Sequence, residues 1–197
     1  MIRFKVCGIS TLKDIEELSR TDVDLLGIVT DKISKRYVSS EFLRLASLMS
    51  AKPIVEVKVN GNLGEMINGL KYANYLQIHR PLSDKELEEL TTIERKRIIL
   101  YVPVEKDQEV YLNKVTKYSK FILLDSPRKG KVVDLSLLKL WVKNYPWVGI
   151  AGGITMENIE SFVDLNPAWI DVSSGVEIYP GKKDMEKVKA MLKVVKK

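Results

Sequence analysis

VGIAGGI at residues 148–154 and WIDVSSGVE at residues 169–177 decide the fold of this chain. Each stretch begins with apolar residues typical of a buried strand and ends in a turn rich in glycine or serine. A helical pattern follows each turn. Two neighbouring parallel strands that end in exposed backbone N–H groups can cradle a phosphate. In a (β/α)8 barrel, such a cradle follows strands 7 and 8.

The rest of the chain repeats this alternation of apolar strand and amphipathic helix. Predicted strands lie at 2–6, 25–29, 54–59, 74–78, 98–102, 120–124, 147–150 and 169–173. Helical periodicity is found near 12–18, 42–49, 63–70, 87–90, 107–118, 135–143, 156–163 and 185–195, and the last two helices are expected to start at Thr155 and Asp184. This order favours an α/β protein with a single (β/α)8 barrel domain over residues 1–197, rather than an open doubly wound sheet.

Length and composition indicate which classes of protein this chain can belong to. The chain has 197 residues, of which 45% are hydrophobic, so it fits one domain, although it is short for this barrel. No apolar run approaches the ~18 residues of a membrane span, and no membrane partner is expected. The N-terminus enters a strand pattern directly, which argues against a signal peptide. The single cysteine excludes an internal disulfide and suits the cytoplasm.

The formal net charge of +6 has two readings. It fits a surface with many lysines, or attraction of an anionic ligand. The basic residues are spread along the chain, and neither a helix-turn-helix nor a metal-ligand spacing stands out, so we expect no nucleic-acid partner and no metal. A phosphorylated small molecule explains the charge at least as well as a nucleic acid does. Apolar residues on the outer helices leave a monomer and a homodimer equally open.

Three side chains near strand ends have functional groups that can take part in catalysis or substrate binding. Cys7 follows the first strand. It is either a small buried hydrophobic residue or a thiolate that the adjoining helix start favours. Asp125 follows the sixth strand. It is either a residue that caps a turn or a general acid whose pKa is raised by burial. Arg36 lies in the loop after the second strand. It is either a solvated surface residue or a residue whose planar guanidinium binds a carboxylate.

Further strand-end residues are candidates for the same site. Gln77 and the only histidine, His79, end the fourth strand, and Asp171 lies inside the eighth. His79 suits acid–base work by type but can equally be structural. Gly152-Gly153 and Ser174-Gly175 can be tight turns, but their occurrence after consecutive strands favours phosphate binding.

These residues belong to a set of motifs that resembles the phosphoribosylanthranilate isomerase family of tryptophan biosynthesis. The resemblance covers nearly the whole chain, and the order and spacing of the motifs make it specific. The motifs are KVCGI at 5–9, SKRYVS at 34–39, VKVN at 57–60, LQIH at 76–79, LLD at 123–125, AGGI at 151–154, DVSSGVE at 171–177 and PGKKD at 180–184.

The resemblance implies an Amadori rearrangement that uses no cofactor. Asp125 would be the general acid and Cys7 the general base, and Arg36 would bind the anthranilate carboxylate. The backbone around Gly152-Gly153 and Ser174-Gly175 would bind the phosphate. Two alternatives remain: another phosphosugar isomerase of the histidine-biosynthesis type, and a non-catalytic barrel that binds phosphate or polyanions. The first typically uses paired strand-end aspartates, which Cys7 disfavours.

The chain departs from the family pattern at two places. Arg80, followed by Pro81, stands where the family usually has glycine. The loop at 126–134 keeps Gly130, a further candidate for substrate contact, but replaces other glycines and the Phe and Trp of the family pattern.

Overall fold

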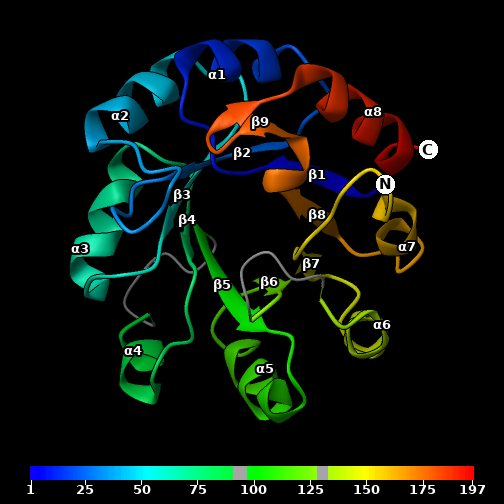
Figure 1. Ribbon diagram of the computed structural model, residues 1–197. Helices are drawn as coiled ribbons and strands as arrows, with labels where there is room; N and C mark the ends of the chain where they lie inside the picture. The colour runs from blue at the N-terminus through cyan, green and yellow to red at the C-terminus, as the bar shows by residue number, and fades with distance from the viewer. Residues whose placement is uncertain (91–96, 128–132) are drawn as a thin grey trace.

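Eight parallel strands form a closed barrel in the computed structural model, which describes residues 1–90, 97–127 and 133–197. Each strand pairs with the next along the chain, and β1 also pairs with β8 to close the barrel (Figure 1). The strands are β1 (Arg3–Val6), β2 (Leu25–Val29), β3 (Ile54–Lys58), β4 (Tyr75–Ile78), β5 (Ile98–Pro103), β6 (Phe121–Asp125), β7 (Gly149–Ile150) and β8 (Trp169–Val172). The barrel prediction is therefore confirmed, with shifts of one or two residues at some strand ends.

The helices form a ring around the barrel (Figure 1). They are α1 (Leu12–Ser19), α2 (Ser40–Met49), α3 (Leu63–Ile67), α4 (Asp84–Glu89), α5 (Glu109–Val115), α6 (Leu135–Asn144), α7 (Ile159–Val163) and α8 (Met185–Val195), with a short 3-10 helix η1 (Asn68–Lys71) after α3.

Helix starts depend on side-chain caps, and the sequence located some of them wrongly. Asp184 caps α8 as expected, because its side chain accepts from two backbone N–H groups of the first turn. Thr155 does not start α7: its N–H donates to the side chain of Asn158, and the helix begins only at Ile159. The helix expected at 107–118 is divided into a 3-10 turn, η4 (Lys106–Gln108), and α5.

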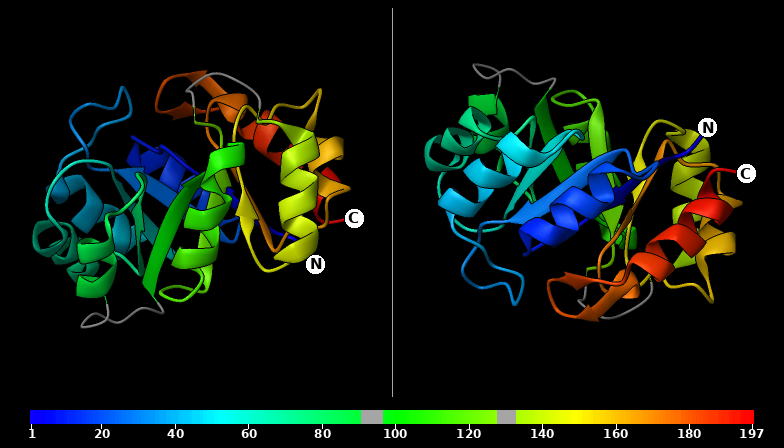
Figure 2. Two further views of the ribbon diagram at one scale, coloured as in Figure 1. Left: turned by 90° about the horizontal axis from the view of Figure 1, so that it is seen from below. Right: turned by 90° about the horizontal axis from the view of Figure 1, so that it is seen from above.

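An antiparallel hairpin, which the sequence did not predict, separates β8 from the last helix. A 3-10 turn, η5 (Ser174–Val176), leads into β9 (Glu177–Tyr179) and β10 (Lys182–Lys183). Figure 2 shows this hairpin, in orange, projecting from one end of the barrel, while the N-terminus lies at the other end. The hairpin therefore stands at the end where the strands finish.

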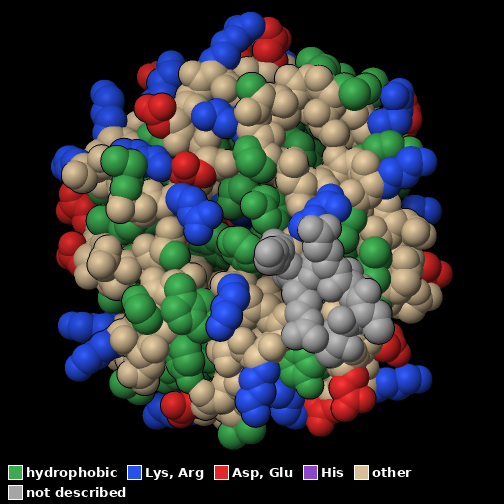
Figure 3. All heavy atoms as spheres, turned by 180° about the vertical axis from the view of Figure 1, so that it is seen from behind, with side chains coloured by type: hydrophobic (Ala, Val, Ile, Leu, Met, Phe, Trp, Pro, Cys, Tyr) green, Lys and Arg blue, Asp and Glu red, His purple; other side chains and the backbone are tan. Residues whose placement is uncertain are grey.

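Apolar side chains fill two separate layers. The larger lies between the strands and the helices, and includes Phe4, Val6 and Ile170. The smaller fills the barrel interior, and includes Val57, Leu123 and Trp169. Figure 3 shows the face opposite to that in Figure 1, where hydrophobic side chains gather near the centre and charges of both signs are interspersed around the edge.

Side-chain alternation brings polar groups into the barrel interior. Because Phe4 and Val6 face the helices, Lys5 of the same strand must face inward. Lys5 is in register with Asp171 of β8, and Gln77 also points inward from β4. These three buried side chains form a polar layer directly beneath the carboxyl ends of the strands.

Candidate active site

A cavity of about 350 Å³ opens at the carboxyl ends of the strands. It collects most of the side chains that the sequence singled out. Its lining includes Cys7, Arg36, Gln77, His79, Asp125, Gly152, Gly153, Asp171 and Ser174. Gly175 adjoins this lining in η5, whereas Gly130 lies outside the described residues. Residues far apart in sequence therefore meet because parallel strands all finish at the same end of the barrel.

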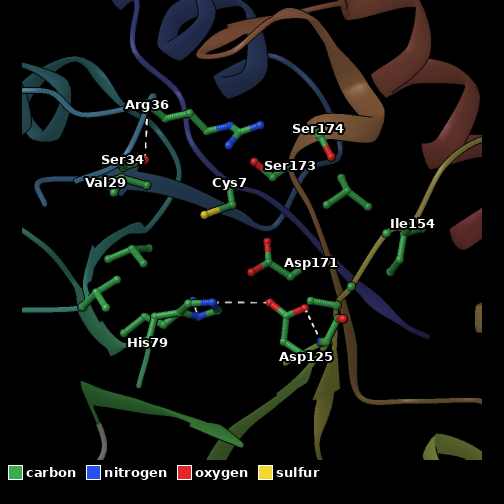
Figure 4. A pocket seen from close by; sticks show the side chains of 18 of the residues that line it. Cys7, Val29, Ser34, Arg36, His79, Asp125, Ile154, Asp171, Ser173 and Ser174 are labelled. Atoms are coloured by element: carbon green, nitrogen blue, oxygen red, sulfur yellow. Dashed lines mark hydrogen bonds and ion pairs between the residues drawn. The ribbon is translucent and has the colours of Figure 1, made fainter. Parts of the chain in front are cut away.

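Asp125, the last residue of β6, has the properties of a carboxyl group that keeps its proton near neutral pH. Burial, followed by the negative charge of Asp171, raises its pKa to about 7, although the Ser126 N–H and Lys5 oppose the rise. Its Oδ1 accepts from the Ser126 N–H at 2.6 Å. Its Oδ2 lies 3.5 Å from Nε2 of His79, as Figure 4 shows. The second oxygen thus faces the cavity beside the imidazole.

Cys7 lies across the cavity from Asp125, with Asp171 between them in Figure 4. Burial raises the pKa of its thiol above the ordinary value; Lys5 and Lys183 lower it, and Asp171 raises it. In the ligand-free protein the thiol of Cys7 therefore holds its proton more firmly than an ordinary cysteine does. The physical reason is the low-dielectric barrel wall, which disfavours the anion more than the nearby positive charges stabilise it.

A chain of polar contacts runs beneath both groups. Lys5 Nζ donates to Asp171 Oδ2 at 2.6 Å and to Gln77 Oε1 at 3.0 Å. Gln77 Nε2 lies 3.1 Å from His79 Nδ1, and His79 Nε2 faces Asp125. Burial lowers the pKa of Lys5, but Asp171 and Cys7 outweigh it, so the net pKa is raised and the ammonium stays charged. Burial likewise raises the pKa of Asp171, which Lys5 opposes.

Arg36 reaches over the cavity from the loop that follows β2, and a carboxylate from the hairpin holds it in place. Its Nε and Nη2 donate to the two oxygens of Glu177 at 2.8 and 2.6 Å. Glu177 also accepts from Lys183 Nζ at 2.7 Å and from the Gly181 N–H at 3.0 Å. Burial raises the pKa of Glu177, but Arg36 and Lys183 outweigh it and the net pKa is lowered. The guanidinium is thus oriented before any ligand arrives.

The two glycine turns pack directly against each other at the rim. A Cβ on Gly175 would lie 2.0 Å from the carbonyl oxygen of Ile154, so only glycine permits this contact. Gly152 has φ +104°, and a Cβ there would lie 2.9 Å from the Ser126 nitrogen. Among the described residues, no hydrogen bond uses the N–H of Gly152, Gly153, Ser174 or Gly175 as donor. These four N–H groups are therefore available to an anion.

Sequence reasoning missed four residues that support this site: Lys5, Asp31, Glu177 and Lys183. The KVCGI and DVSSGVE motifs contain Lys5 and Glu177, but residue type alone does not reveal that they are buried. Asp31 ties the loop of Arg36 to the next strand end, because its Oδ2 accepts from the N–H groups of Val59 and Asn60 at 2.9 and 2.6 Å.

The described residues contain neither a metal-binding cluster nor a membrane-spanning helix. Within 1–90, 97–127 and 133–197, no group of three or more His, Cys, Asp or Glu side chains is arranged to hold a metal ion. In the same part of the chain, no helix combines the length and apolarity needed to cross a membrane.

Comparisons with known proteins agree with this geometry. The family model of N-(5'-phosphoribosyl)anthranilate (PRA) isomerase matches residues 4–194. The N-(5'-phosphoribosyl)anthranilate isomerase of Saccharolobus solfataricus is 48% identical, over 100% of this chain and 97% of the relative. The phosphoribosyl anthranilate isomerase structure from Thermotoga maritima superposes with a TM-score of 0.85 at 31% identity, over 100% of this chain and 99% of that one.

A further solved phosphoribosyl anthranilate isomerase is a complex with reduced 1-(o-carboxyphenylamino)-1-deoxyribulose 5-phosphate. It has a TM-score of 0.83 and 30% identity, and covers 100% of this chain and 99% of that one. With a family model that spans nearly the whole sequence, a relative that is 48% identical over 97% of its own length, and a shared barrel, the chain belongs to the N-(5'-phosphoribosyl)anthranilate isomerase family.

Proposed function

We propose that this chain converts N-(5'-phosphoribosyl)anthranilate to 1-(2-carboxyphenylamino)-1-deoxyribulose 5-phosphate, with Asp125 as general acid and Cys7 as general base. The observation that carries these roles is that Asp125 and Cys7 face each other across one cavity, and that the pKa of the Asp125 carboxyl is about 7. A general acid must hold a proton near the working pH, and an ordinary aspartate does not. The reaction moves only protons and bonds within one molecule, so we expect it to need no cofactor.

The acid acts first in this scheme. Asp125 gives its proton to the ring oxygen of the ribose, and the bond between that oxygen and C1 breaks. The nitrogen lone pair forms the Schiff base cation at C1, and a C4 hydroxyl is left. Oδ1 of Asp125 is already engaged by the Ser126 N–H, so the proton is delivered from Oδ2, which lies beside His79. Asp125 becomes a carboxylate in this step.

The base then completes the rearrangement. The Cys7 thiolate removes the C2 proton, and the electrons of that C–H bond neutralise the Schiff base to give an enolamine. Transfer of a proton from the C2 hydroxyl to C1 gives the ketone. The positive charge at C1 makes the C2 proton acidic only after ring opening, so the order of the two steps follows from the chemistry. Cys7 and Asp125 lie on two sides of the cavity, where they can act on neighbouring atoms.

The two ends of the substrate have separate anchors in this proposal. The backbone N–H groups at Gly152-Gly153 and Ser174-Gly175 would bind the phosphate, as partial positive charges suited to an anion. Arg36 would bind the anthranilate carboxylate. Its Nε and Nη2 already contact Glu177, and no hydrogen bond between described residues uses Nη1. Holding both ends places the ribose between the acid and the base.

Turnover of the two variants tests the assigned roles. Loss of substrate fluorescence follows the reaction when N-(5'-phosphoribosyl)anthranilate is generated in the cuvette. Cys7→Ala and Asp125→Asn should each reduce turnover by at least about 10²–10⁴-fold, the contribution of a general acid or base. Asp84→Asn, a carboxyl-to-amide change on the exposed start of α4, is the matched control. Near-normal turnover in a folded Cys7→Ala or Asp125→Asn variant would refute that role.

A further inference from the structure

Lys5 is a buried cation that the scheme above does not use. Its side chain is 1% exposed, and it faces the barrel interior from β1, two residues before Cys7. A buried ammonium is costly unless charges and hydrogen bonds compensate it. Asp171 compensates the charge at 2.6 Å, and the Gln77 oxygen accepts at 3.0 Å. A residue that only filled space at this position would be apolar, as Leu25 and Leu123 are elsewhere in the barrel interior.

We propose that Lys5 is a positioning residue that acts on both working groups: it is the counter-charge for the Cys7 thiolate, and it fixes the direction of the hydrogen bonds that reach Asp125. The proposal rests on the roles proposed for Cys7 and Asp125. Lys5 does not line the cavity, so it acts through its neighbours and not by contact with the substrate.

The counter-charge part follows from the groups that surround Cys7. Lys5 and Asp171 lie below it, Lys183 approaches from the hairpin, and Arg36 from the loop after β2. His79 and Asp125 lie across the cavity. Arg36 and Lys183 are both bound to Glu177, which offsets their charge. Of the cations near Cys7, Lys5 lowers the pKa of the thiol most.

The hydrogen-bond part follows from donor and acceptor rules. An ammonium only donates, so the Gln77 atom that faces Lys5 must be the oxygen, and Nε2 must face His79. An amide nitrogen only donates, so Nδ1 of His79 must accept. A neutral imidazole then carries its proton on Nε2, which faces Asp125. The charge on Lys5 thus sets the tautomer of His79 at a distance, through Gln77.

The protonation states required of the two groups show why a counter-charge matters. The scheme needs Asp125 protonated and Cys7 ionised, but the pKa of Asp125 is about 7 and that of the thiol is raised above its ordinary value. The active combination is therefore a minor population at every pH. Each further pH unit in the thiol pKa would reduce that population about tenfold.

Alkylation of Cys7 tests the counter-charge without measuring activity. Cys7 is the only cysteine, so the pH dependence of its reaction with neutral iodoacetamide reports its ionisation alone. Lys5→Met should raise the midpoint of that curve by about one pH unit or more, the effect of losing an adjacent opposite charge. Cys7→Ser is the control for alkylation at other sites. An unchanged or lower midpoint in folded Lys5→Met protein overturns the proposal.

A second variant protects the test against misfolding. Lys5→Met leaves Asp171 buried without its partner, and this loss can prevent folding. Asp171→Asn keeps Lys5 and the shape of the site but removes the negative charge, so it should lower the midpoint. Opposite shifts from the two partners of one ion pair are not expected from general loosening. An unchanged or raised midpoint in Asp171→Asn protein also overturns the proposal.

The single histidine tests the other part of the proposal. Nitrogen-15 NMR of the wild-type protein should show the proton of neutral His79 on Nε2, and Lys5→Met should shift the tautomer toward a mixture. A proton on Nδ1 in the wild type overturns this part. Failure of the proposed function is distinguishable: if Cys7→Ala stays active while Lys5→Met shifts the alkylation midpoint, Cys7 is not the base but Lys5 still sets its ionisation.

Discussion

Asp125→Asn should make the protein inactive and, above neutral pH, more stable. Burial places the pKa of Asp125 at about 7, against an ordinary value of 3.8. At low pH the carboxyl is protonated in both the folded and the unfolded chain, and its ionisation has no effect on stability. As the pH rises from about 4 to about 7, the unfolded chain releases this proton more readily than the folded one, so the free energy of unfolding falls.

The magnitude follows from the size of that shift. About three pH units correspond to about 4 kcal/mol of lost stability above pH 7. The side chain is 19% exposed, so solvent screens part of this effect and the figure is an upper bound. Asparagine cannot ionise, and its amide oxygen can still accept from the Ser126 N–H. The variant should therefore escape the penalty while keeping the contact with Ser126.

Urea unfolding at a series of pH values measures the effect. The informative quantity is the stability of Asp125→Asn minus that of the wild type, at pH 8 relative to pH 4, because pH-independent effects of the substitution cancel. The same comparison in a His79→Gln background shows whether the effect depends on the neighbouring imidazole. Asp84→Asn, at an exposed carboxyl, should show almost no such change. A difference that is the same at pH 4 and pH 8 would refute a buried, proton-holding Asp125.

Three further predictions concern the rim of the cavity. Glu177→Gln should lower the free energy of unfolding by about 3–5 kcal/mol, because Lys183 stays buried and Arg36 loses its carboxylate; a loss below about 1 kcal/mol in urea unfolding would contradict this. Gly152→Ala should cost about 1–3 kcal/mol through its positive φ and the close Ser126 nitrogen, and an unchanged melting temperature would argue against that backbone strain. Inorganic phosphate should raise the melting temperature of the wild type but not that of folded Gly175→Ala protein. At a hundredfold excess of phosphate over its Kd, the wild type should gain about 2.7 kcal/mol of stability. An equal response of both proteins would place the anion elsewhere.

Local sequence patterns predicted most of the fold. Apolar runs such as 121–124 and the helical periodicity between the strands predicted the barrel, because a parallel strand covered on both faces and a one-sided helix leave distinct patterns. Helix boundaries were less accurate, as at Thr155, whose N–H donates to the side chain of Asn158 while α7 begins only at Ile159. The hairpin at β9 and β10 was missed because a two-residue strand has no measurable period.

The candidate site, too, was predicted in part from the sequence and in part not. Residue type and position at strand ends singled out Cys7, Asp125 and Arg36, since the barrel topology alone brings strand ends together. The ionisation of Cys7 could not be predicted from the sequence, because desolvation depends on the packing around the thiol and not on its neighbours in sequence. The partnership of Arg36 with Glu177 joins residues 141 positions apart and has no local signal.

The sequence by itself determined the barrel, the family and the identity of the groups at the strand ends, because periodicity and motif spacing are properties of the chain. Only the tertiary structure decided the protonation of those groups and the partners that hold them. Burial and charge act through space, and it is the closure of β1 against β8 that places Lys5 beside Asp171 under Cys7.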